Sequence, residues 1–133
     1  MKVMVNGTFD ILHRGHLQML QYAKNLGNHL LVAIDTDRRV KELKGLDRPI
    51  NNQNDRRFML ESLRYVDTVY FFDSKDQLIE LMKEYQPDIY VKGGDWKKDK
   101  KSTAHQYCKE VIYYDRVEQY STTKIIQDII NRG

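Results

Sequence analysis

Two histidines, His13 and His16, stand three residues apart in the segment GTFDILHRGH, which spans residues 7–16. If a helix begins at about Arg14 and Gly15, side chains at this spacing project on one side of it, so both imidazoles can face one ligand. Imidazole N–H groups can hydrogen-bond the negative charge that develops on a phosphate under attack. The pair is therefore a candidate for stabilising a transition state of phosphate chemistry, without acting as a nucleophile.

Two glycines frame this pair where a strand is expected to turn into a helix. Gly7 lets the backbone approach a phosphate closely, and a helix starting at Gly15 offers free N–H groups and the positive end of its dipole to an anion. An isolated pair would more simply be a capping and a surface histidine, and a zinc site would need a matching set of cysteines or carboxylates. The setting favours a triphosphate site instead.

A second group of candidates is basic and lies between the second and third expected strands. Its members are Lys41, Lys44, Arg48, Arg56, Arg57 and Arg64. Surface charge is the simpler explanation for any one of them, but their density exceeds the needs of a solvated helix face. As a set they suit binding of phosphate groups.

Two further loops carry candidate ligand-binding residues. Gly93 and Gly94 follow a buried run and let the main chain pass against a flat base, while Trp96 either stacks on that base or packs as a partly buried aromatic. Near the C-terminus, the successive hydroxyl residues 121–123 precede an apolar helical pattern. They can cap that helix, and they also form a ready site for an anion.

The elements that must position these residues alternate short apolar runs with longer amphipathic stretches. Strands are expected at residues 3–6, 30–34, 68–72, 89–92 and 111–114, and helices at 15–26, 57–63, 77–85 and 122–130. This alternation predicts an α/β fold, a Rossmann-like three-layer sandwich with a five-stranded parallel sheet and helices on both faces. Gly27 is expected to close the first helix, and residues 1–133 are expected to form a single domain.

The composition limits the possible classes of protein. Lys plus Arg number 22 against 19 Asp plus Glu, so the formal net charge is only +3 and argues against nucleic acid as a partner. No apolar stretch is long enough to span a bilayer, and the N-terminus has no apolar leader. The single cysteine, Cys108, fits a reducing compartment, so we expect a cytoplasmic protein. The sequence contains neither a P-loop nor a dinucleotide-binding glycine motif.

The segment GTFDILHRGH resembles the signature G-x-F-D-x-x-H-x-G-H of the cytidylyltransferase-like superfamily of nucleotidyltransferases. The resemblance implies that His13 and His16 contact the triphosphate. It also implies that Thr8 and Phe9 supply backbone contacts near it, and that Asp10 lies near the acceptor or a metal.

Two neighbouring families share the rest of the pattern. KELKGLDRPINN and VKGGDW resemble the heptose-1-phosphate adenylyltransferase domain, whereas Trp96 and the run RYVD resemble glycerol-3-phosphate cytidylyltransferase. The shared resemblance implies phosphate binding by Lys41 and Lys44, which we group with the histidines as catalytic. It further implies roles for the remaining candidates, in nucleotide binding for Asp95, Arg116, Ser121 and Thr122 and in acceptor binding for Asp37, Arg56 and Arg64. Both families usually have glycine where this chain has Gln119, which leaves the turn before Tyr120 open.

The favoured hypothesis is transfer of a nucleoside monophosphate from ATP or CTP to a phosphorylated sugar or polyol, with release of pyrophosphate. We expect a heptose-1-phosphate adenylyltransferase, with synthesis of CDP-glycerol as the alternative and a non-catalytic nucleotide-binding module as a third possibility. Mg²⁺ is expected to arrive with the triphosphate, so no metal site is assigned to the protein. The resemblance also implies a homodimer.

Overall fold

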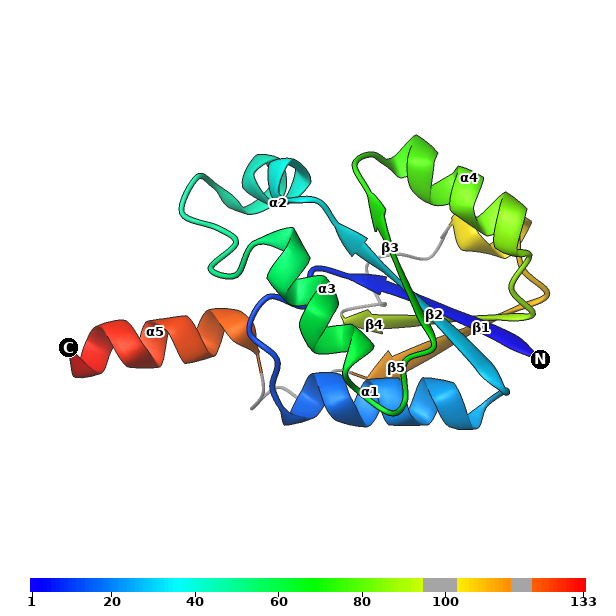
Figure 1. The fold of residues 1–133 in the computed structure, drawn as a ribbon, viewed down its shortest axis with the longest axis horizontal. Coiled ribbons are helices and arrows are strands. Elements are labelled where there is room, and N and C mark those ends of the chain that lie inside the picture. Colours follow the sequence, from blue (N-terminus) through cyan, green and yellow to red (C-terminus); the bar gives the residue numbers. More distant parts are fainter. Residues whose placement is uncertain (95–102, 116–120) are drawn as a thin grey trace.

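The computed structural model describes residues 1–94, 103–115 and 121–133. These residues form five strands joined by helices (Figure 1). The strands are β1 (Lys2–Gly7), β2 (His29–Asp35), β3 (Thr68–Phe72), β4 (Ile89–Gly94) and β5 (Glu110–Asp115). The helices are α1 (Arg14–Asn25), α2 (Asp37–Lys44), α3 (Gln53–Glu61), α4 (Lys75–Tyr85), the 3-10 helix η2 (Thr103–Gln106) and α5 (Thr122–Arg132). Asp95, Trp96, Arg116 and Gln119 lie outside the described residues.

All five strands are parallel and follow the order β3-β2-β1-β4-β5. The chain therefore builds one half of the sheet outward from β1, returns, and builds the other half from β4. Open α/β sheets bind ligands where the order reverses, beyond the carboxyl ends of the strands. In this protein that place lies between the ends of β1 and β4.

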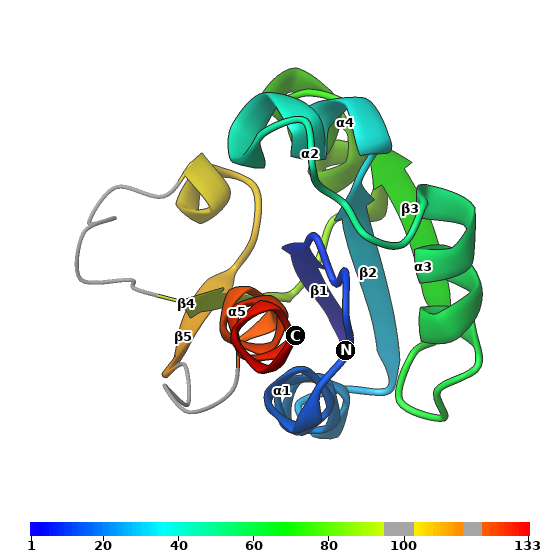
Figure 2. The same ribbon diagram turned by 90° about the vertical axis from the view of Figure 1, so that its left-hand side faces the viewer.

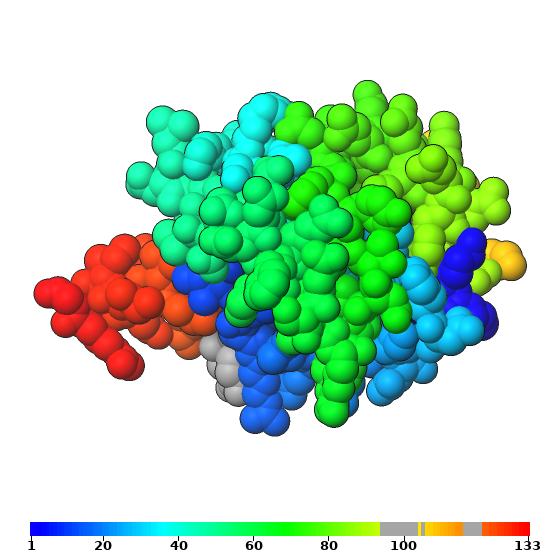
Figure 3. Space-filling view, in the orientation of Figure 1, coloured from blue at the N-terminus to red at the C-terminus, as the bar shows by residue number. Residues whose placement is uncertain are grey.

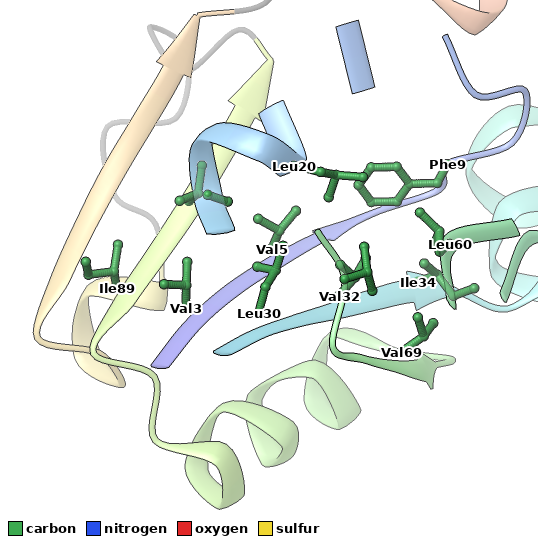
Figure 4. Close-up of a cluster of buried hydrophobic side chains, with 13 residues drawn as sticks. Val3, Val5, Phe9, Leu20, Leu30, Val32, Ile34, Leu60, Val69 and Ile89 are labelled. Carbon is green, nitrogen blue, oxygen red and sulfur yellow. The ribbon is translucent and has the colours of Figure 1, made fainter. Parts of the chain in front are cut away.

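Apolar side chains on both faces of the sheet form the core. Val5 and Val32 point to the face covered by α1 and α3, where they pack with Leu20 and Leu60 (Figure 4). Met4 and neighbouring residues on the opposite face pack against α4 and η2. The sheet is thus the middle one of three layers (Figure 2), and the prediction of a Rossmann-like α/β sandwich is confirmed.

The helices near the basic segment differ from the sequence expectation. No helix was expected at residues 37–44, but they form α2, whose first turn Thr36 caps by accepting a hydrogen bond from Arg39 N. Helix α3 begins four residues before the expected position 57, since the Asn52 side chain accepts from Asp55 N at 2.8 Å. In both cases a capping residue determines where the helix begins.

Glycine occupies position 27 for a reason other than the predicted one. Helix α1 ends at Asn25, and its C-cap residue, Leu26, has a right-handed backbone, so no left-handed glycine closes the helix. A Cβ at Gly27 would instead lie 2.4 Å from the carbonyl oxygen of Met1. The position needs glycine because the N-terminus of the chain passes directly beside it.

Helix α5 extends away from the body of the protein (Figures 1 and 3). None of its residues is buried, and Ile129 and Ile130 are each about three-fifths exposed. Only its first turn approaches the carboxyl end of the sheet.

Within the described ranges, no helix has the length and apolar character needed to cross a membrane.

Candidate functional site at the carboxyl end of the sheet

A pocket of about 260 Å³ opens where the strand order reverses. Three segments that are far apart in the sequence form most of its wall: the turn from β1 into α1, the end of β4, and the first turn of α5. Lys44 of α2 and Tyr114 of β5 complete it. The lining residues are Asn6, Gly7, Thr8, Phe9, His13, Gly15, His16, Met19, Lys44, Gly93, Tyr114, Ser121, Thr122 and Thr123.

His13 and His16 cap the first turn of α1 for each other. Nδ1 of His13 accepts from the backbone N–H of His16 at 3.4 Å, and Nδ1 of His16 accepts from the backbone N–H of His13 at 3.3 Å. A backbone N–H can only donate, so Nδ1 of each ring is unprotonated, and in the neutral ring the proton is on Nε2. The capping box thus fixes the tautomer of two rings that line the pocket.

The immediate surroundings keep His16 uncharged. Burial lowers the pKa of His16 to about 3, helped by the adjacent His13 and by Lys44. The two imidazoles stack with centroids 3.8 Å apart, and Phe9 packs on the His16 ring at 5.1 Å. At neutral pH His16 is therefore a neutral imidazole with one N–H, on Nε2. It lacks the second, acidic proton of an imidazolium group.

The turn that leads into these histidines has an unusual backbone. Phe9 has a φ of 52°, in the left-handed region that residues with a Cβ rarely adopt, although its side chain is buried in the core. A Cβ at Gly7 would lie 2.9 Å from the Phe9 ring, so Gly7 is required for this ring position. Such strain persists only where the surroundings hold the backbone in place.

Arg56 provides much of that support. Its side chain is fully buried and donates from Nη1 to the carbonyl oxygens of Thr8 and Asp35, at 2.9 and 2.8 Å. It also donates from Nε to Asn51 O at 3.0 Å and from Nη2 to Asp37 at 2.8 Å. Arg56 therefore ties the end of β2 and the start of α3 to the turn after β1.

Asp10 has a comparable role toward the loop between α2 and α3. Its buried carboxylate accepts from the backbone N–H groups of Ile50 and Asn51, each at 2.8 Å, and from Arg48 Nε at 3.4 Å. Lys41 donates to the carbonyl oxygen of Arg48 at 3.1 Å. These contacts hold residues 48–51 against the turn after β1.

Lys44 is the basic residue that lines the pocket. Desolvation lowers its pKa, and the nearby positive charge of Arg48 lowers it further, whereas Asp35 and Asp10 act in the opposite direction. An anion in the pocket would offset both unfavourable effects on the ammonium group. The arrangement suits a phosphate ligand.

The first turn of α5 brings hydroxyl groups to the other side of the pocket. Ser121 caps the helix by accepting from Lys124 N at 3.0 Å. Thr122 donates to the carbonyl oxygen of Ile11 at 2.9 Å, which ties α5 to the turn after β1. The pocket therefore lies at the N-terminal ends of two helices, α1 and α5, both of which attract anions.

Three lining residues were not anticipated from the sequence. They are Asn6, Met19 and Tyr114, whereas Thr123 belongs to the hydroxyl run that was predicted to bind an anion. Two of these residues could have been predicted from their positions. Met19 lies one turn after His16 on α1, and Tyr114 lies near the end of β5. Asn6 is a polar residue near the end of β1, and its side chain accepts a hydrogen bond from the buried Tyr90 hydroxyl.

The pocket brings together most of the residues that the sequence singled out. Gly7, Thr8, Phe9, His13, Gly15, His16, Lys44, Gly93, Ser121 and Thr122 all line it. Lys41, Asp10, Asp37 and Arg56 do not, and the last two of these form an ion pair with each other. Arg64 precedes β3 and so lies at the amino end of the sheet, the end opposite the pocket. Asp95, Trp96 and Arg116 belong to residues that the structure does not describe.

The described residues do not gather metal ligands. Across 1–94, 103–115 and 121–133, no group of three or more His, Cys, Asp or Glu side chains is placed to hold a metal ion. The pocket lining contains no carboxylate among these residues.

Comparison with known proteins agrees with this geometry. The sequence profile of a family described as cytidylyltransferase-like matches residues 4–128, which is nearly the whole chain. The chain belongs to the cytidylyltransferase-like family. The prediction of a nucleotidyltransferase of this type is confirmed.

Several curated relatives of the chain bear the name Bifunctional protein HldE. The protein from a Nitratiruptor species is 50% identical over 125 residues, 94% of this chain and 27% of that protein. The protein from Campylobacter fetus subsp. fetus is 48% identical over 127 residues, 96% of this chain and 27% of that protein. The chain thus spans about a quarter of the length of these relatives.

Among solved structures, a lipopolysaccharide core biosynthesis protein from Thermoplasma volcanium GSS1 has a TM-score of 0.72 and 26% sequence identity. The match covers 91% of this chain and 98% of that protein. The fold described above is therefore similar to one that has been solved before.

Proposed function

We propose that the chain is a sugar-phosphate adenylyltransferase that joins ATP to a heptose 1-phosphate and releases pyrophosphate. The observation that carries the proposal is the pair of histidines that cap α1 through Nδ1, with His16 kept neutral, on a pocket at the N-terminal ends of two helices. The similarity to bifunctional HldE proteins and the segments KGLDRP and VKGGD support the heptose type of acceptor.

In the proposed reaction, a phosphate oxygen of the acceptor attacks the α-phosphorus of ATP in line with the departing pyrophosphate. A new P–O bond forms as the bond between the α-phosphorus and its bridging oxygen breaks, and that oxygen leaves with the electron pair. Negative charge then grows on the α-phosphate oxygens and on pyrophosphate. No covalent intermediate with the enzyme is required.

The residues of the pocket suit the stabilisation of that charge. The Nε2–H groups of His13 and His16 can donate to the phosphate oxygens, and the fixed tautomer means that no rearrangement is needed during the reaction. With its pKa at about 3, His16 acts as a hydrogen-bond donor and not as a general acid. Lys44 places its amino group beside the same anion.

We also propose that Mg²⁺ enters with the triphosphate, because the described lining offers no carboxylate to hold it. The cation would neutralise part of the charge on the phosphate chain. A cytoplasmic homodimer is the form that the family resemblance supports. Sedimentation velocity over a tenfold range of protein concentration would measure the oligomeric state.

The test is a pyrophosphate-release assay with ATP and with CTP, each paired with heptose 1-phosphate, other sugar 1-phosphates and glycerol 3-phosphate. Turnover that is fastest with ATP and heptose 1-phosphate is the expected result. Preference for CTP and glycerol 3-phosphate would replace the proposal with the synthesis of CDP-glycerol. If no pair turns over while ATP still binds by calorimetry, the chain is a nucleotide-binding module.

A further inference from the structure

Arg48 is held in an unusual state in the loop between α2 and α3. Its side chain is only 13% exposed, and its one ion-pair contact among the described residues, from Nε to Asp10, is long at 3.4 Å. In the part of the chain that the structure describes, Nη2 of Arg48 is buried without any hydrogen-bond partner. A buried donor on a charged group that lacks an acceptor is costly, so this position is a poor final one for a guanidinium group.

Asp10 does not depend on Arg48. Two backbone N–H groups, those of Ile50 and Asn51, already donate to its two oxygens at 2.8 Å each. The main chain at Arg48 is held separately, through the bond from Lys41 to its carbonyl oxygen. The guanidinium can therefore leave Asp10 while the loop around it keeps its hydrogen bonds.

The neighbouring charges also favour such a movement. Arg48 is the strongest positive influence on Lys44, and it lowers the pKa of that pocket-lining ammonium. The carboxylates that act on Lys44 are those of Asp10 and Asp35, and Asp35 is itself engaged by Arg39 at 2.8 Å. A dianionic phosphate between Lys44 and Arg48 would relieve the repulsion between them.

We propose that Arg48 binds the phosphate group of the acceptor, moving its guanidinium from Asp10 to a position beside Lys44 when the acceptor enters. This inference rests on the proposed function and names the residue that recognises its second substrate. The planar fork of arginine donates two parallel hydrogen bonds to a phosphate, which a lysine cannot do. Lys44 is the last residue of α2 and Arg48 follows it by four residues, so the two side chains start from neighbouring parts of the chain.

Arg56 and Arg64, which the sequence assigned to acceptor binding, are poorly placed for that role. Arg56 has all three of its guanidinium nitrogens engaged within the protein, and its side chain is fully buried. Arg64 lies at the amino end of the sheet, away from the pocket. Among the arginines that the basic segment contributes, Arg48 combines closeness to Lys44 with an unpaired donor.

The experiment compares Arg48→Gln and Arg48→Lys with a matched control, Arg57→Gln. Arg57 belongs to the same basic segment, but it is exposed on α3 and pairs with Glu61. Steady-state kinetics give KM for the sugar 1-phosphate, KM for ATP and kcat for each variant. Thermal unfolding verifies that each variant is folded, and the unfolding temperature of Arg48→Gln should not fall below that of the wild type.

Loss of a charged, two-bond phosphate contact should raise the acceptor KM of Arg48→Gln at least about tenfold, while KM for ATP changes less than about threefold. The acceptor KM of Arg48→Lys should lie between those of the wild type and Arg48→Gln. The acceptor KM of Arg57→Gln should match that of the wild type. An unchanged acceptor KM in Arg48→Gln, or an equal rise in both KM values, overturns the inference. If Arg48→Gln does not fold, Arg48→Lys is judged by the same two KM values.

Calorimetry distinguishes failure of this inference from failure of the proposed function. The wild type and Arg48→Gln are titrated with heptose 1-phosphate in the presence of a non-hydrolysable ATP analogue. If the wild type turns over but Arg48→Gln has a normal acceptor KM, only the assignment of Arg48 fails. If the wild type does not turn over at all, the proposed function fails, and weaker sugar-phosphate binding by the variant still supports Arg48, whereas equal binding overturns it.

Discussion

Histidines at the two ends of the sheet are bound in opposite ways. At the amino end, His29 uses both ring nitrogens inside the protein, with the Tyr85 hydroxyl at 2.7 Å and the Thr68 hydroxyl at 3.2 Å. At the carboxyl end, His13 and His16 use Nδ1 to cap α1 and carry their proton on Nε2, in rings that line the pocket.

The difference shows how a structural and a chemical role share one residue. An imidazole has two nitrogens, so the His16 ring can satisfy the helix terminus with Nδ1 and donate to a ligand from Nε2. His29 has no nitrogen left for such a purpose. The arginines divide in the opposite way, because Arg56 supports the carboxyl end from within, whereas Arg64 is exposed at the amino end.

The largest expected effect concerns Arg56. Arg56→Met removes the donor to the carbonyl oxygens of Thr8, Asp35 and Asn51 and leaves Asp37 without its ion-pair partner. Because these groups lie mostly inside the protein, we expect a loss of about 3–5 kcal/mol in the free energy of unfolding. Urea unfolding followed by circular dichroism measures it. A loss below about 1 kcal/mol would show that Arg56 does not support the turn after β1.

The next effect concerns the chemical role of His13. His13→Asn keeps a side-chain oxygen that can cap α1 but removes the imidazole Nε2–H. Loss of one donor to the transition state should lower kcat by roughly 10²–10³-fold, with little change in the unfolding temperature. Pyrophosphate release under saturating substrates measures kcat.

His29→Gln at the other end of the sheet is the control for this variant. It should lower the unfolding temperature, because two internal hydrogen bonds are disturbed, and leave kcat near the wild-type value. If His13→Asn retained full activity, the ring would serve only as a helix cap. That was the simpler interpretation of the isolated pair in the sequence.

The sequence predicted the sheet and the first loop well for a physical reason. Buried parallel strands are continuous apolar runs, so all five appeared in the sequence with errors of at most two residues at their ends. The signature GTFDILHRGH is local, and the capping box that holds it forms between residues only three apart. Local patterns of this kind can be interpreted without knowing the fold.

The basic segment was less predictable because its residues depend on tertiary contacts. Lys41, Lys44, Arg56 and Arg64 have the same charge in the sequence, yet only Lys44 lines the pocket. Burial of Arg56 depends on carbonyl oxygens contributed by the turn after β1, by β2 and by the loop after α2, which no sequence spacing reveals. For the same reason, the internal role of Asp10 became visible only in the structure.

The third effect is a pH dependence of stability that arises from His16. Its pKa is about 3 in the folded protein and about 6.5 when unfolded, so the unfolded chain binds a proton first as the pH falls. Stability should therefore decrease from about pH 6.5 downward, by up to about 1.4 kcal/mol per pH unit. The carboxylates with lowered pKa, those of Asp67, Asp73 and Asp88, contribute only nearer to about pH 4.

Urea unfolding between about pH 7 and pH 4.5 isolates this contribution when the wild type is compared with His16→Gln. Glutamine at this position can still bond back to the N-cap backbone, so the capping box is preserved while the titrating ring is lost. The variant should lose less stability than the wild type over this interval. Equal losses in both would mean that His16 is not buried as a neutral ring.

The smallest expected effect concerns Arg64, to which the sequence gave the same role as Arg56. Arg64 is exposed. Its Nη2 donates a hydrogen bond to the hydroxyl of the adjacent Tyr65 at 2.9 Å, and its guanidinium lies over the Tyr65 ring. Arg64→Ala should change the free energy of unfolding by less than about 0.5 kcal/mol and leave both KM values near those of the wild type. Lys44→Ala, made in parallel, should raise the KM for a phosphate-bearing substrate. A similar rise in Arg64→Ala would bring the amino end of the sheet, or a second copy of the chain, into substrate binding, and the contrast between the two ends would no longer hold.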